Sequence, residues 1–212
     1  MPKRWVRGNR KDYFYLKAKE EDYRSRAYYK LLQASQKFQF IKPQDVVVDL
    51  GAAPGGWLQA TRKIVGSKGF VLGIDIVKIE PLEYPNVFTI VGDITEPDIV
   101  DRIKAILPRQ ADVVISDVSP HVSGIWEVDH ARQIDLANSS MHIARSVLRD
   151  KGNFFVKLFQ GDLFNSFLNR MKKSFADVKV IKPQASRKES AEIYILGLGF
   201  IGKDILGSSC EI

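Results

Sequence analysis

The sequence is poor in cysteine, histidine and long hydrophobic runs. Its one cysteine, Cys210, excludes a disulfide framework and suits a reducing compartment. The three histidines show no pairing with that cysteine that would predict a zinc site. The longest apolar run, residues 193–201, is too short to span a bilayer, and the N-terminus has no apolar signal stretch. These absences predict a soluble cytoplasmic protein without a metal or a membrane partner.

A chain of 212 residues has room for one α/β domain and a short extension. Its net charge is +7, and the first thirty residues hold ten Lys or Arg against four Asp or Glu, so six of the seven excess charges lie there. Aromatic residues are interleaved with these cations, which suits a polyanion with exposed bases better than a merely solvated terminus. We therefore predict an RNA-binding extension and helix at 1–40, the main domain at 41–202 and a tail at 203–212.

The stretch 46–57, VVVDLGAAPGGW, organises the rest of the chain. Its β-branched run predicts a strand buried on both faces, and the small residues 51–53 let the following loop come close to a ligand. Gly55 and Gly56 open a helix that continues through Ile64. A tight turn without a ligand is the alternative, but the pattern favours a nucleotide-like ligand.

Two common nucleotide ligands are disfavoured by what this loop contains. A dinucleotide fingerprint would place glycine where Ala53 stands, and a phosphate loop would end in Gly-Lys-Ser or Gly-Lys-Thr rather than Gly-Gly-Trp. S-adenosylmethionine is the remaining common ligand.

Strand and helix patterns alternate along the chain. After the strand at 46–50 we expect strands at 69–75, 86–91, 111–116, 152–159, 178–182 and 193–200, and helices at 22–38, 98–107, 129–148 and 162–175. This alternation predicts an α/β fold with a doubly wound, mostly parallel seven-stranded sheet covered by helices on both faces.

Four acids, Asp49, Asp75, Asp93 and Asp117, end successive predicted strands. The carboxyl ends of parallel strands meet at one edge of the sheet, so all four should face the same ligand. We expect Asp75 to bind ribose hydroxyls and Asp93 to meet an adenine, with turn-capping roles as the alternative for both.

Lys157 interrupts an apolar strand, and a buried ammonium is costly unless it is paired or neutralised. Desolvation and a second cation, for which Lys30 is a candidate, would make the neutral amine available as a general base, and Asp117 would orient it. A lysine that snorkels to solvent is the alternative. Glu192 opens the last strand and either positions the lysines or the substrate hydroxyl, or is an exposed strand end.

S-adenosylmethionine is a methyl donor, and the atom that accepts the methyl group can be narrowed down by elimination. Methylation of a pyrimidine carbon needs a cysteine nucleophile, and Cys210 lies in the tail. Methylation of an exocyclic amine usually goes with an Asn/Asp-Pro-Pro-aromatic motif, from which residues 117–120, DVSP, depart. Oxygen is therefore the better acceptor, and the reaction needs in-line alignment and removal of one proton.

With these residues assembled, the chain resembles the FtsJ/RrmJ (RlmE) family of S-adenosylmethionine-dependent ribosomal RNA 2'-O-ribose methyltransferases, which have a Rossmann-like fold. The likeness runs from about residue 22 to 200 and rests on SRAYYKL at 25–31, DLGAAPGGW at 49–57, SD at 116–117, VK at 156–157 and SAE at 190–192. The resemblance implies a catalytic tetrad of Lys30, Asp117, Lys157 and Glu192, in which Lys157 accepts the proton. It implies cofactor contacts at Gly55, Trp57, Asp75, Asp93 and Asp117.

The same resemblance implies a substrate. It is the 2'-hydroxyl of a uridine in the peptidyl-transferase A loop of large-subunit (23S) ribosomal RNA, within the assembled subunit, and no obligatory protein partner is evident. Related members methylate tRNA anticodon loops or messenger RNA caps, and the tetrad does not separate these substrates. A tRNA 2'-O-methyltransferase is therefore the alternative, and a non-catalytic RNA-binding assembly factor is a weaker one because it would not need Lys157.

Overall fold

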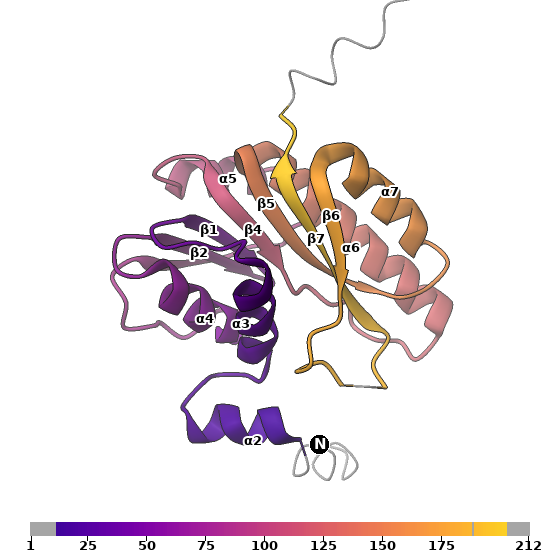
Figure 1. Cartoon of the computed structure of the whole chain (residues 1–212), viewed down its shortest axis with the longest axis horizontal. Coiled ribbons are helices and arrows are strands. Elements are labelled where there is room, and N and C mark those ends of the chain that lie inside the picture. Colours follow the sequence, from indigo (N-terminus) through magenta and orange to yellow (C-terminus); the bar gives the residue numbers. More distant parts are fainter. Residues whose placement is uncertain (1–11, 188, 203–212) are drawn as a thin grey trace, which may run out of the picture.

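The computed structural model describes residues 12–187 and 189–202, which form a single seven-stranded sheet with helices on both faces (Figure 1). The strands lie in the order β3-β2-β1-β4-β5-β7-β6. Strands β1 to β5 are parallel, whereas β7 runs antiparallel to both β5 and β6. This confirms the predicted doubly wound sheet. The strands are β1 Val46–Leu50, β2 Phe70–Asp75, β3 Val87–Val91, β4 Ala111–Ser116, β5 Leu148–Phe159, β6 Phe175–Ile181 and β7 Glu192–Phe200.

Six helices are described: α2 Tyr13–Glu20, α3 Ala27–Phe38, α4 Gly56–Val65, α5 Ile99–Ile106, α6 Trp126–Val147 and α7 Phe164–Ser174. Helices α3 and α4 pack together on one face of the sheet, and α5, α6 and α7 cover the other (Figure 1). The core is accordingly split into two apolar layers, and successive residues of β5 alternate between them: Phe154 faces α6 and α7, and Phe155 faces α3 and α4. Covering both faces explains why β1 is completely buried and apolar except for Asp49.

The structure corrects one helix boundary near the N-terminus and adds a helix before it. The helix expected at 22–38 begins only at Ala27, because Asp22 has a φ of 58° and interrupts the helical backbone before it. The backbone N–H of Arg24 donates to the side chain of Gln59 on α4 at 2.9 Å, which fixes this break. Helix α2, which the sequence patterns did not predict, is capped by Asp12 through a hydrogen bond from the Tyr15 N–H at 3.2 Å.

Helix α6 begins at Trp126, three residues before the expected start, and β5 begins at Leu148 rather than at residue 152. Asp129 does not cap the helix. Its carboxylate lies inside the first turn and accepts hydrogen bonds from the N–H groups of Ser123 and Gly124 in the preceding loop. The helix expected at 162–175 is shorter, and β6 begins directly after it at Phe175.

Helix α3 contributes Tyr28 and Leu31 to the core, so it is packed into the main domain although it falls within the predicted 1–40 segment. That division of the chain stays a prediction, and residues 1–11 and 203–212 lie outside the described residues. In the part of the chain that the structure describes, no helix combines the length and the apolar character needed to cross a bilayer.

Candidate active site

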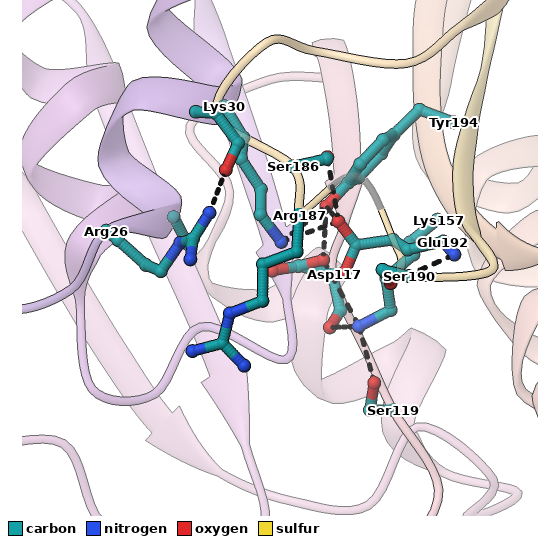
Figure 2. Close-up of polar contacts among 12 residues, drawn as sticks. Arg26, Lys30, Asp117, Ser119, Lys157, Ser186, Arg187, Ser190, Glu192 and Tyr194 are labelled. Atoms are coloured by element: carbon teal, nitrogen blue, oxygen red, sulfur yellow. Dashed lines mark hydrogen bonds and ion pairs between the residues drawn. The ribbon is translucent and has the colours of Figure 1, made fainter. Parts of the chain in front are cut away.

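The amine of Lys157 is held by three oxygen atoms at the carboxyl edge of the sheet. Only 4% of Lys157 is exposed. Its Nζ donates to the backbone oxygen of Asp117 at 2.6 Å and to Oγ of Ser119 at 2.5 Å, and it lies 3.2 Å from Oδ1 of Asp117 (Figure 2). An ammonium has three protons, so each has an acceptor here. The predicted pairing of a buried Lys157 with Asp117 is therefore present.

Lys30 approaches the same site from α3. Its Nζ donates to Oε1 of Glu192 at 2.6 Å and to the hydroxyl of Tyr194 at 3.3 Å (Figure 2). Glu192 is the first residue of β7, and because β7 runs opposite to the parallel strands, its start lies where they end. The structure thus brings Lys30, Asp117, Lys157 and Glu192 together, although Lys30 is paired with Glu192 rather than with Asp117.

Tyr194 joins the two ion pairs. Its hydroxyl lies 2.9 Å from Oδ1 of Asp117 and 3.1 Å from Oε1 of Glu192. In the register of β5 and β7, Tyr194 is directly opposite Lys157. We call Lys30, Asp117, Lys157, Glu192 and Tyr194 the polar cluster.

Opposing effects act on the carboxyl group of Asp117. Burial alone would raise its pKa, but the charges of Lys157 and Lys30 and the hydrogen bond from Tyr194 outweigh burial, and the pKa is lowered. Burial and the neighbouring carboxylates Asp117 and Glu192 raise the pKa of Tyr194 well above its ordinary value. The site therefore holds an ionised Asp117 and a protonated tyrosine hydroxyl near neutral pH.

A cavity of about 540 Å³ lies next to the polar cluster, shares Asp117 with it and is also lined by Ser119, which holds the amine of Lys157. The loop after β1 contributes Gly51, and the ends of the neighbouring strands contribute Asp75 and Asp93. Asp75 is fixed by the N–H groups of Ala53 and Val77, both at 2.9 Å, and Asp93 by the N–H and hydroxyl of Thr95, both at 2.8 Å. Three of the four strand-end acids thus face one cavity.

A model of the FtsJ-like methyltransferase family matches residues 23–200. The chain belongs to this family. Ribosomal RNA large subunit methyltransferase E of Methanocaldococcus jannaschii is 49% identical over 204 residues, covering 95% of this chain and 83% of the relative. The protein of the same name from Methanothrix thermoacetophila is 54% identical over 189 residues, covering 89% and 72%. A solved chain described as a ribosomal RNA methyltransferase of Plasmodium falciparum has a TM-score of 0.75 at 28% identity and covers 85% of this chain and 100% of its own.

Two residues that the FtsJ-like resemblance assigned to the cofactor lie away from the cavity lining. The indole of Trp57 is 3% exposed, donates to the backbone oxygen of Ala27 at 2.7 Å and stacks on Phe155. Gly55 caps the start of α4 with a φ of 111°, where a Cβ would lie 3.0 Å from the side chain of Arg24. Only the backbone of these residues, at the N-terminal turn of α4, is therefore left to bind a ligand.

Asp49 is the strand-end acid that does not line the cavity of this FtsJ-like protein. It is completely buried at the end of β1, and neither carboxyl oxygen has a hydrogen-bond partner among the described residues. Burial and the nearby charges of Asp117 and Asp75 raise its pKa well above the ordinary value. The surroundings of Asp49 thus favour its neutral form, in contrast to those of Asp117.

Tyr194 is the functional candidate that the sequence patterns missed. Glu192 and Tyr194 are two residues apart on one strand and therefore face the same side of the sheet, which was a usable signal. Among residues 12–187 and 189–202, no group of three or more His, Cys, Asp or Glu side chains is placed to hold a metal ion.

Proposed function

We propose that this FtsJ-like methyltransferase transfers a methyl group from S-adenosylmethionine to the ribose 2'-hydroxyl of a uridine in large-subunit (23S) ribosomal RNA, within the assembled subunit. The observation that carries the proposal is the buried amine of Lys157, because the residues that hold it, Asp117 and Ser119, also line the cavity. The substrate is supported by the relatives, which are named ribosomal RNA large subunit methyltransferases.

The residues around the cavity fit S-adenosylmethionine. The carboxylates of Asp75, Asp93 and Asp117 suit a ligand that carries positive charge and ribose hydroxyls. The N–H groups in the first turn of α4, near Gly55 and Trp57, have no intrahelical partners and suit its carboxylate. When bound, this cofactor supplies an electrophilic methyl group. We assign its contacts to these five residues.

Lys157 is the proton acceptor in the proposed reaction, since a ribose hydroxyl is a weak nucleophile until its proton is removed. Its contacts at 2.5 and 2.6 Å, to Ser119 and the backbone of Asp117, orient the amine. The third contact, to the Asp117 carboxylate, is longer at 3.2 Å. The ammonium that forms is then stabilised by that carboxylate.

The other members of the polar cluster act on Asp117 and on one another. Lys30 lowers the pKa of Asp117, and Tyr194 holds one of its carboxyl oxygens by a hydrogen bond at 2.9 Å. Glu192 fixes Lys30 at 2.6 Å, so that the second amine has a defined place at the edge of the site. Together they keep Asp117 ionised and Lys157 oriented without taking part in a covalent step.

RNA binding is assigned to the basic, aromatic segment at 1–40. In its described part, α2 exposes Tyr13 and Tyr15 beside Lys17 and Lys19, so rings and cations are available together. This combination suits contacts to phosphates and to unpaired bases. The proposal includes a cytoplasmic ribosomal subunit as the partner and no obligatory protein partner.

The test is the transfer of a labelled methyl group from S-adenosylmethionine to large ribosomal subunits, protein-free ribosomal RNA and tRNA, followed by alkaline hydrolysis. A 2'-O-methyl group protects the adjacent phosphodiester bond, so we expect the label in alkali-resistant dinucleotides from the subunits, and nuclease mapping should place it on a uridine. Label in tRNA alone would replace the substrate with the alternative, and label in single nucleotides would mean base methylation and refute the reaction.

A further inference from the structure

Large apolar side chains are exposed around the start of α6. Trp126 is 46% exposed, and the loop before it leaves Val122 and Ile125 even more open to solvent. With Val128 and Leu163, which are also exposed, these residues form what we call the apolar patch. The proposed chemistry leaves these side chains without a role, and exposed apolar groups that gather in one place indicate a binding surface.

The apolar patch is held in a fixed arrangement. The buried carboxylate of Asp129 accepts hydrogen bonds from the N–H and hydroxyl of Ser123, both at 2.7 Å, and from the N–H of Gly124 at 3.1 Å, which shapes the loop before α6. The indole of Trp126 stacks on His130 at a centroid distance of 5.8 Å, and Nε2 of His130 accepts a hydrogen bond from the N–H of Leu163 at 3.1 Å. Little conformational freedom therefore remains to be lost when a ligand binds.

Two connections place the apolar patch next to the polar cluster: a ring contact to β5 and the loop that precedes α6. Trp126 stacks on Phe159 at a centroid distance of 6.0 Å. Phe159 lies two residues beyond Lys157 on β5, so the side chains of Phe159 and Lys157 face the same side of the strand from backbone positions about 7 Å apart. The loop that leads to Trp126 starts at Asp117 and Ser119, which hold the amine of Lys157. In Figure 2, Ser119 stands at the end of the contacts farthest from Lys30, so the site continues toward this loop.

We infer that Trp126 is the stacking platform for the base of the nucleotide whose ribose is methylated, an inference that rests on the proposed function. A hydroxyl can reach a buried amine only if its nucleotide leaves the stack of the RNA, and the unstacked base then needs a new partner. An indole with apolar neighbours offers one, because every base has a face that can stack on it. Such a platform would fix the ribose relative to Lys157.

The experiment compares Trp126→Ala, Trp126→Phe and a matched control in full-length protein, with the RNA that accepts the methyl group. The control is Phe88→Ala, because Phe88 is 44% exposed and stacks on Phe70 at 4.9 Å on the distant edge strand β3. Loss of base stacking should raise the KM for RNA by roughly 5- to 150-fold in Trp126→Ala. The KM for S-adenosylmethionine should not change, Trp126→Phe should recover most of the loss because a smaller ring still stacks, and Phe88→Ala should behave like the wild type.

A second measurement separates stacking from a structural role, and uses RNA that lacks the base at the methylated position. For the wild type, removing the base should raise the KM for RNA by as much as Trp126→Ala raises it on intact RNA. For Trp126→Ala, removing the base should not raise the KM further. The assignment would be overturned if the variant were as much worse than the wild type on abasic RNA as it is on intact RNA, so that the two losses added, or if removing the base mattered only at a neighbouring nucleotide. Unchanged kinetics of Trp126→Ala would overturn it while the proposed function stood, whereas a wild type that forms no 2'-O-methyl group would refute both.

Discussion

Replacing Lys157 by arginine separates the positive charge of this side chain from its ability to accept a proton. A guanidinium stays protonated at any accessible pH, yet it can still pair with a carboxylate. If Lys157 is the general base, the rate of methyl transfer should fall by about 10²- to 10⁴-fold in Lys157→Arg. The stability of the fold should change little, because the charge opposite Asp117 is kept.

The companion variant Lys157→Met removes the charge as well. At 3.2 Å and an effective dielectric constant of about 20, the attraction between Lys157 and Asp117 is about 5 kcal/mol before desolvation is subtracted. Removing one partner of a buried pair typically costs about 3 to 5 kcal/mol. We expect a loss toward the lower end of that range, because Asp117 keeps its hydrogen bond to Tyr194.

The assay is single-turnover methyl transfer at saturating RNA and cofactor, together with calorimetric binding of S-adenosylmethionine and denaturant unfolding. Lys179→Arg is the matched control, since Lys179 also pairs with an acid, Asp177 at 2.9 Å, but in solvent on β6. Both variants of Lys157 should bind cofactor like the wild type and lose turnover, and only Lys157→Met should lose stability. A Lys157→Arg enzyme with wild-type turnover would refute the role of this amine as the base.

Two further substitutions test the remaining buried groups. Tyr194→Phe removes a hydrogen bond to a charged carboxylate, so the free energy of unfolding should fall by about 1.5 to 3 kcal/mol. The same bond helps to lower the pKa of Asp117, so the acid limb of the pH–rate profile should move to higher pH. An unshifted acid limb would contradict this account. The pKa of Asp49 is higher in the folded protein than in the unfolded chain, where it is about 3.9. Between the unfolded and the folded pKa, the folded protein therefore binds more protons than the unfolded chain. The stability of the wild type should fall as pH rises through this interval. Asp49→Asn should remove this fall, so its free energy of unfolding should gain up to about 1.4 kcal/mol over the wild type per pH unit. The measurement is denaturant unfolding without cofactor at several pH values. Parallel pH curves for both proteins would show that Asp49 does not cause the fall in stability.

Several features of the site were predictable because they depend on a residue that conflicts with its surroundings. A lysine inside the apolar run of β5 had to be compensated, and the structure supplies Asp117 and Ser119. The acids at the strand ends had to meet because parallel strands share one carboxyl edge, and Asp75, Asp93 and Asp117 line one cavity. In both cases local sequence and the rules of sheet topology agree.

Other features depend on pairings that the sequence alone does not specify. The position of Tyr194 opposite Lys157 follows from the antiparallel register of β5 and β7, whose strands are separated by α7 and β6 in the chain. The sequence also does not show which side of α4 faces the core, so it could not reveal that the indole of Trp57, which the resemblance places at the cofactor, is buried against Phe155. Helix α2 was missed because only its capping residue, Asp12, distinguishes its start from the surrounding charged segment.

The reversed direction of β7 has a consequence for the order in which the site can be completed during synthesis. Lys30, Asp117 and Lys157 leave the ribosome before Glu192 and Tyr194, which belong to the last strand in the chain and reach the carboxyl edge only when β7 pairs between β5 and β6. Until that pairing forms, the amine of Lys30 lacks Glu192 and the carboxylate of Asp117 lacks its tyrosine. A nascent chain can therefore present much of its sheet before it has an intact polar cluster, and the arrival of one strand completes the site.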